Sequence, residues 1–244
     1  MIKFRDGKMF KNLTNLDVDI HKNLRFEPSV SLKFAATTPS APVVASEMSQ
    51  AMRQFPIVFP EDGPLLPFVF MSLKQDENAF IDADGAWLGD YLPAHIRRFP
   101  FILGHTDDPD KFTIMFDDDA SEISEVSGNR LYDDEGGMAP ALTETVEFLQ
   151  AFQSEIQATE MLLKPLIEKD VMTQQNISVN RPDGSTWTFD NVRAVDMDRV
   201  RALDDATIAE WARSGLMDVI YAHVHSLENV RYLAERQGII ATEV

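Results

Sequence analysis

The side chains of this sequence that are best suited to metal chemistry are one aspartate and three histidines. His105 and Asp107 are separated by one residue, and His223 and His225 follow more than a hundred positions later. A His-x-Asp pair with a distant histidine matches the ligand set of iron(II) oxygenases. Arg231 could bind the distal carboxylate of a 2-oxoglutarate cosubstrate. One hypothesis is therefore an iron(II)/2-oxoglutarate-type hydroxylase with His105, Asp107 and His223 as its metal ligands.

Several features weigh against this metal site. The tripeptide His-x-Asp is frequent, and here it begins an acidic loop, 105–110, whose simpler interpretation is a solvated turn. On a helix, His223 and His225 would point about 200° apart and could not bind one metal ion together. The β-helix fold of such hydroxylases also needs more strands than the sequence predicts. We therefore expect no resident metal and no other cofactor.

A second catalytic pattern consists of His225, Ser226 and Glu228, which supply the residue types of a hydrolase triad. No Gly-x-Ser-x-Gly motif accompanies it, and residues adjacent in sequence are poorly placed to form a triad. A histidine that is hydrogen-bonded within a helix interface is the simpler interpretation, because buried polar groups are nearly always bonded. We therefore expect a non-catalytic protein and keep the hydroxylase as the alternative.

Segment 87–101 is the best candidate for a binding surface, because it combines aromatic rings, two prolines and adjacent arginines. One arginine could stack on Trp87 or Tyr91 while the other binds a carboxylate partner or an anionic ligand. Alternatively, an internal arginine–aspartate pair, with Asp84 or Asp90, pins the loop to the sheet. Neighbouring residues of a helix diverge by about 100°, so the two arginines should have different roles. The candidate ligand- or partner-binding residues are Trp87, Tyr91, His95, Arg97 and Arg98.

Prolines and apolar patterns predict the elements around this segment. Pro93 can begin a short helix, and Pro100 forces Phe99 out of helical geometry. A strand at 99–103 should then pair with one at 112–116. Earlier in the chain we expect buried strands at 55–59 and 65–73, and a helix over 40–52 that Ser40 caps.

The second half of the sequence is mainly helical. Apolar residues recur at helical spacing from Leu142 to Leu166 and predict one long helix. Residues 177–180 and 186–189 flank a turn sequence and predict a hairpin. The expected later elements are a helix capped by Asp196 or Asp198, one capped by Asp204 that ends at Gly215, and a last helix from Leu216 to Gln237.

Together these elements predict an α+β fold, in which an antiparallel sheet in the N-terminal half packs against the long helix and a C-terminal helical region. We expect a single domain over residues 1–244, with the acidic segment 117–137 as the one place for a subdivision.

Composition narrows the function classes. There is no cysteine, which excludes disulfides, thiolate catalysis and Cys-based metal sites. The formal net charge of −18 disfavours nucleic acid and anionic lipid as partners. No apolar run is long enough for a signal segment or a membrane span. We therefore expect a cytoplasmic protein without direct membrane insertion.

Three features of the sequence resemble the SapC family of bacterial proteins. They are the stretch Trp87–Phe101, Asn78 with the Asp84-Gly85 turn, and the run Gly215–Leu227, and the likeness extends from about Phe34 to Leu233. The resemblance implies a link with the bacterial cell surface, since the family takes its name from a surface-layer locus. It also implies a genetic association with outer-membrane TonB-dependent receptors, cupin-like proteins and tryptophan-halogenase-like flavoproteins, but it assigns no catalytic residues. We therefore expect an accessory protein that binds a peptide, a protein partner or a small ligand.

Overall fold

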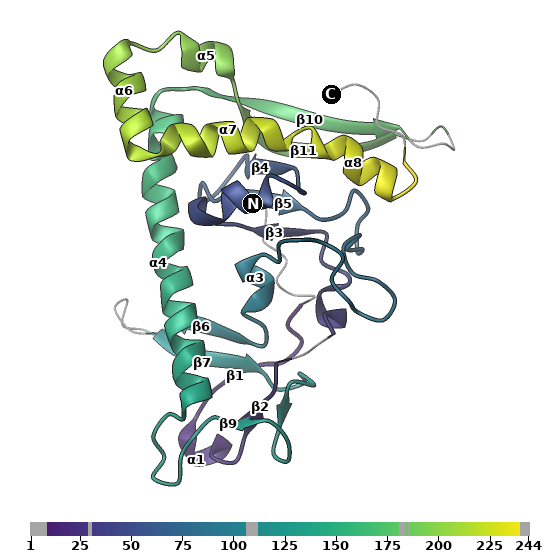
Figure 1. The fold of residues 1–244 in the computed structure, drawn as a ribbon, viewed down its shortest axis with the longest axis vertical. Coiled ribbons are helices and arrows are strands. Elements are labelled where there is room, and N and C mark those ends of the chain that lie inside the picture. The colour runs from purple at the N-terminus through teal and green to yellow at the C-terminus, as the bar shows by residue number, and fades with distance from the viewer. Residues whose placement is uncertain (1–8, 29–30, 106–111, 181–183, 185, 240–244) are drawn as a thin grey trace.

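The structure is a computed structural model that describes residues 9–28, 31–105, 112–180, 184 and 186–239. Its strands form three antiparallel sheets, and one long helix runs along them while a group of C-terminal helices lies across one end (Figure 1). This arrangement confirms the predicted α+β fold with a long helix and a C-terminal helical region. None of the helices in the described ranges is both long and apolar enough to cross a membrane.

The largest sheet combines strands from both halves of the chain. Its five strands, in spatial order, are β10 (Met172–Asn180), β11 (Thr186–Val195), β4 (Ile57–Pro60), β5 (Phe68–Phe70) and β3 (Ser40–Pro42). The predicted hairpin is therefore present, and both of its strands are longer than the predicted ranges of 177–180 and 186–189. It joins the sheet because Val192 and Arg193 of β11 pair with Pro60 and Phe59 of β4. The N-terminal strands are thus only part of this sheet.

Two smaller sheets lie at the other end of the molecule (Figure 1). The predicted pairing of the strands at 99–103 and 112–116 is confirmed, with Phe101 opposite Phe116 and Leu103 opposite Ile114. One sheet contains β1 (Leu13–Asn15), β7 (Phe112–Asp117) and β6 (Phe101–His105), and the other contains β8 (Ile123–Ser124), β2 (Arg25–Phe26) and β9 (Asn129–Arg130).

The helix predicted over 40–52 is wrong in its first half. Ser40 does not cap a helix but begins β3, where it lies opposite Phe70 of β5. Burial in the sheet overrides the local capping chemistry, since Ala41 and Val43 are both buried. Helical structure starts later, with a 3₁₀ turn at Ala45–Glu47 followed by α2 (Met48–Ala51). The other short helices are α1 (Val18–His21), α3 (Ala94–Arg97) and a 3₁₀ turn at Lys33–Ala35.

The long helix is α4 (Pro140–Glu168), which confirms the helix predicted from Leu142 to Leu166. Pro140 occupies its first turn, where proline is well tolerated. Its N-terminal part places Leu142 and Leu149 in a cluster with the small sheets, whereas Leu163 and Leu166 belong to the main core. Helix α4 therefore contributes to the packing at both ends of the molecule (Figure 1).

The C-terminal helices follow the predicted caps, with one interruption. Asp196 and Asp204 accept hydrogen bonds from the first turns of their helices, and Gly215 ends the second helix in the left-handed conformation. The last predicted helix is divided at Leu227 and Glu228. The resulting elements are α5 (Met197–Arg201), α6 (Asp205–Ser214), α7 (Leu216–Ser226) and α8 (Asn229–Arg236).

Three buried polar residues on α7 and α8, His223, Ser226 and Asn229, dock these helices on the N-terminal half; we call them the polar stripe. Ile57 lies at the start of β4, and its N–H donates to Ser226 Oγ at 2.9 Å. His223 Nδ1 donates to Ile57 O at 2.8 Å, and Val195 N–H donates to His223 Nε2 at 3.1 Å. The stripe thus satisfies backbone groups of both β4 and β11.

Asn229 continues the same contact one turn further on. Its Nδ2 donates to Met52 O at 2.7 Å and to Phe55 O at 3.1 Å. These two carbonyls follow α2, so the start of α8 is fixed directly against the end of α2.

The bonds of His223 define its protonation state. A carbonyl oxygen can only accept and an amide N–H can only donate, so Nδ1 carries the proton and Nε2 does not. Burial lowers the pKa of His223 to about 4, against the opposing effect of the bond to Ile57 O. The hydrogen-bonded histidine of the helix interface is therefore His223, whereas His225 is exposed.

We predict that His223→Ala lowers the free energy of unfolding by roughly 3 kcal/mol, because it leaves two buried backbone groups without a partner and opens a cavity. His225→Ala is the matched control, since His225 is exposed on the same helix, and it should stay within about 0.5 kcal/mol of the parent. Urea denaturation at neutral pH measures both effects. Equal loss in the two variants would contradict the docking role of His223.

The low pKa of His223 predicts acid sensitivity. Its folded-state pKa of about 4 lies below the ordinary 6.5, so the unfolded chain binds the extra proton first as the pH falls. The contribution of His223 to the free energy of unfolding is complete above about pH 6.5 and decreases by on the order of 3 kcal/mol as the pH falls toward 4. Unfolding free energies across this window should therefore fall more steeply for the parent than for His223→Ala. Parallel curves would show that His223 is not held neutral.

Candidate functional site

The segment singled out by the sequence is anchored by Glu47, a buried residue of the 3₁₀ turn before α2. Its Oε1 accepts hydrogen bonds from Tyr91 Oη at 2.5 Å and from Ala94 N–H, the first residue of α3, at 2.8 Å. Its Oε2 accepts from Val44 N–H at 2.9 Å. Burial raises the pKa of Tyr91, and the hydrogen bond to Glu47 raises it further. Tyr91 is therefore a neutral hydrogen-bond donor to Glu47.

Gln54 holds the residues just before this anchor. Its Nε2 donates to Tyr91 O at 2.6 Å, and its Oε1 accepts from Asp90 N–H at 2.8 Å. Gly89 is required by this close approach, since a Cβ there would lie 2.8 Å from Gln54 Oε1 and 3.0 Å from Trp87 Nε1. The loop is thus pinned by an amide side chain.

Arg97 lies on the exposed side of α3. Its guanidinium carbon is 5.4 Å from the centre of the Phe148 ring on α4, and its Nε donates to Leu92 O at 3.1 Å. Within the described ranges, no ion pair joins Arg97 to Asp84 or Asp90. Arg97 therefore connects α3 to α4.

Arg98 points elsewhere, as predicted for neighbouring residues of a helix. Its guanidinium carbon lies 5.6 Å from the centre of the Phe10 ring, and its NH2 nitrogen is 3.5 Å from Nε2 of the buried His95. The guanidinium of Arg97 thus lies over the Phe148 ring and that of Arg98 over the Phe10 ring, while a side-chain hydrogen bond and the positive charge of Arg97 act on Tyr91, where they partly offset the rise in its pKa.

The residues of the hydroxylase hypothesis are not brought together in the described part of the chain. Asp107 and the side chain of His105 lie outside that part. Both ring nitrogens of His223 are bonded to backbone groups, which leaves neither for a metal. Ser226 Oγ donates to His223 O, so it is not paired with His225 as a triad would require. Among the residues that can be assessed, no group of three or more histidines and carboxylates is arranged to hold a metal ion.

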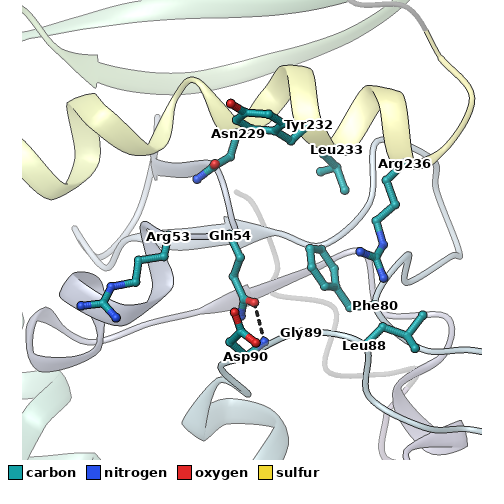
Figure 2. A pocket seen from close by; sticks show the side chains of 10 residues that line it. All are labelled: Arg53, Gln54, Phe80, Leu88, Gly89, Asp90, Asn229, Tyr232, Leu233 and Arg236. Atoms are coloured by element: carbon teal, nitrogen blue, oxygen red, sulfur yellow. Dashed lines mark hydrogen bonds between the residues drawn. The ribbon is translucent and has the colours of Figure 1, made fainter.

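A surface pocket of about 510 Å³ lies between the Leu88–Asp90 loop and α8 (Figure 2). None of the five predicted binding residues lines it, although the loop belongs to the predicted segment. Trp87 lies behind the pocket, where its ring stacks on Phe80 at 5.6 Å and 28°. The lining residues are Arg53, Gln54, Phe80, Leu88, Gly89, Asp90, Asn229, Tyr232, Leu233 and Arg236.

The pocket has one cationic side chain that is held in place. Arg236 Nε donates to Ala79 O at 2.8 Å, and its guanidinium carbon lies 4.7 Å from the centre of the Phe80 ring. Leu88 and Tyr232 are 49% and 63% exposed at the rim. The arrangement offers an apolar wall, an oriented guanidinium and a phenol to a ligand.

Sequence reasoning missed most of these residues. Asn229, Leu233 and Arg236 recur at spacings of four and three and share one face of α8, so helical periodicity could have grouped them. Arg53, Gln54 and Phe80 carry no such pattern, because contacts across the fold bring them to the pocket.

The fold and pocket define an α+β protein with a preformed surface site. The chain matches the model of the SapC family over residues 16–233 and therefore belongs to that family. Comparison with curated proteins and with solved structures finds no match.

We predict that Gln54→Ala loosens the pocket loop, because two backbone groups of residues 90 and 91 lose their partners. The unfolding free energy should fall by about 1–2 kcal/mol, and hydrogen exchange at the Asp90 amide should become faster. Arg53→Ala is the matched control, since Arg53 is its exposed neighbour. If exchange at Asp90 were the same in the parent and Gln54→Ala, the loop would be held by other contacts.

Proposed function

We propose that this SapC-family protein is a non-catalytic accessory protein that binds a small ligand in the pocket between the Leu88–Asp90 loop and α8. The observation that carries the proposal is that both walls of this pocket are held by hydrogen bonds within the protein. Gln54 holds one wall, and Asn229 and Arg236 hold the other by bonds to backbone carbonyls. A site that is already ordered loses little conformational entropy on binding.

The size of the pocket supports a small ligand. Its volume of about 510 Å³ lies within the range of roughly 300–1,000 Å³ found for small-molecule sites. Apolar side chains with a few placed polar groups are also the usual lining of such sites. We favour this ligand class over a peptide or protein partner, which the sequence alone left open.

The family supplies the biological setting of the proposal. Membership in SapC supports a role beside cell-surface or outer-membrane uptake systems, because the resemblance carries that association. The absence of cysteine is compatible with a reducing compartment, and we propose a cytoplasmic location.

Fluorine NMR of fluorotryptophan-labelled protein tests the proposal directly. Trp87 stacks on Phe80 in the pocket wall, whereas Trp211 is a buried core residue of α6. Titration with a library of small organic fragments should shift the Trp87 signal, which Trp87→Phe assigns, and leave Trp211 unchanged. Mass spectrometry should recover the bound fragments unaltered.

A wall variant provides the control for this experiment. Leu88→Asp should abolish the shifts, while Ile20→Asp should preserve them, because Ile20 is a 76% exposed apolar residue outside the pocket. No shift of Trp87 by any fragment, or chemical conversion of the bound fragments, would overturn the proposed function.

A further inference from the structure

We propose that the pocket recognises the carboxylate of a small monoanionic organic acid, with Arg236 as the anion anchor and an apolar wall for the rest of the ligand. This inference rests on the proposed function and names its ligand class.

The first support is the state of Arg236. Its Nε bond to Ala79 O and its position over Phe80 fix the plane of the guanidinium. No ion pair of Arg236 occurs in the parts of the chain that the structure describes. A guanidinium that is held in one plane and has no carboxylate partner is suited to bind a carboxylate through two parallel hydrogen bonds.

Several other arginines of the protein have a carboxylate partner, which Arg236 lacks in the described structure. Acidic side chains outnumber basic ones, at 40 to 22, so most cations can find a carboxylate close by. The described arginines with such a partner are Arg130 with Asp134, Arg199 with Asp170, Arg201 with Asp198, and Arg231 with Glu235. Arg97 is held in the same way, by a bond to a backbone carbonyl and over a phenylalanine ring, but it does not line the pocket, whereas Arg236 does.

The other lining residues define the rest of the ligand. Phe80, Leu88 and Leu233 give the pocket an apolar wall beside the guanidinium (Figure 2). Asp90 lines the same pocket, and its carboxylate would repel a second negative charge. Arg53 also lines the pocket, but Figure 2 shows its guanidinium on the other side of Gln54, directed away from Arg236. A monocarboxylate with an apolar body therefore fits the surroundings of Arg236 better than a phosphate dianion does.

The matched probes are 4-phenylbutanoate and 4-phenylbutanamide, which share their body and differ in charge. We expect the acid to bind the parent at least about tenfold more tightly than the amide, and to weaken as salt is raised. Arg236→Gln should abolish this preference while amide binding changes less than about twofold. Arg231→Gln, on the same helix but outside the pocket lining, should bind like the parent.

The readout separates this inference from the proposed function. Trp87 fluorine shifts report whether either probe occupies the pocket, and Arg236→Lys with thermal melts guards against a folding defect. If both probes bound at Trp87 with equal affinity, or if Arg236→Gln kept the preference for the acid, the carboxylate inference would fail and the binding function would stand. If neither probe shifted Trp87 but other fragments did, the carboxylate inference would again fail alone.

Discussion

The docking of the C-terminal helices depends on the need to satisfy buried backbone groups at the start of β4. Ile57 has both its N–H and its C=O bonded by side chains of α7, Ser226 and His223. A buried amide or carbonyl without a partner costs about 1–3 kcal/mol, so this position strongly favours one placement of α7. The placement of α8, and with it one wall of the pocket, follows from the next contact of the same kind, at Asn229.

The opposite wall is fixed from the same short segment. Residues 47–57 supply Glu47 and Gln54, which hold Tyr91 and Asp90. They also supply the backbone groups of Met52, Phe55 and Ile57 that the polar stripe binds. Both walls of the pocket are therefore positioned relative to α2 and the start of β4. A change in this segment would move the two walls together, whereas a change in α8 alone would move one wall against the other.

The sequence predicted the elements whose signals are local. Helical spacing gave α4, turn residues gave the β10–β11 hairpin, and aspartate caps gave α5 and α6. It failed at Ser40, where burial in a sheet overrode a capping pattern. The pocket could not be predicted, because Ile57 and His223 or Gln54 and Tyr91 meet across the fold, and no periodicity in one sequence encodes such pairs.

The aromatic side chains of the segment that identified the family lie behind the candidate site, while its Leu88–Asp90 loop forms one wall of the pocket. Trp87 stacks on Phe80, and the same ring of Phe80 lies under the guanidinium of Arg236. Tyr91 is turned inward to Glu47, while Gly89 lets the chain pass close to Gln54. The aromatic segment therefore helps to hold Phe80 and the Leu88–Asp90 loop in place. The side chains that a ligand would touch come from α8, from Arg53, Gln54 and Phe80, and from Leu88 and Asp90 of the segment itself.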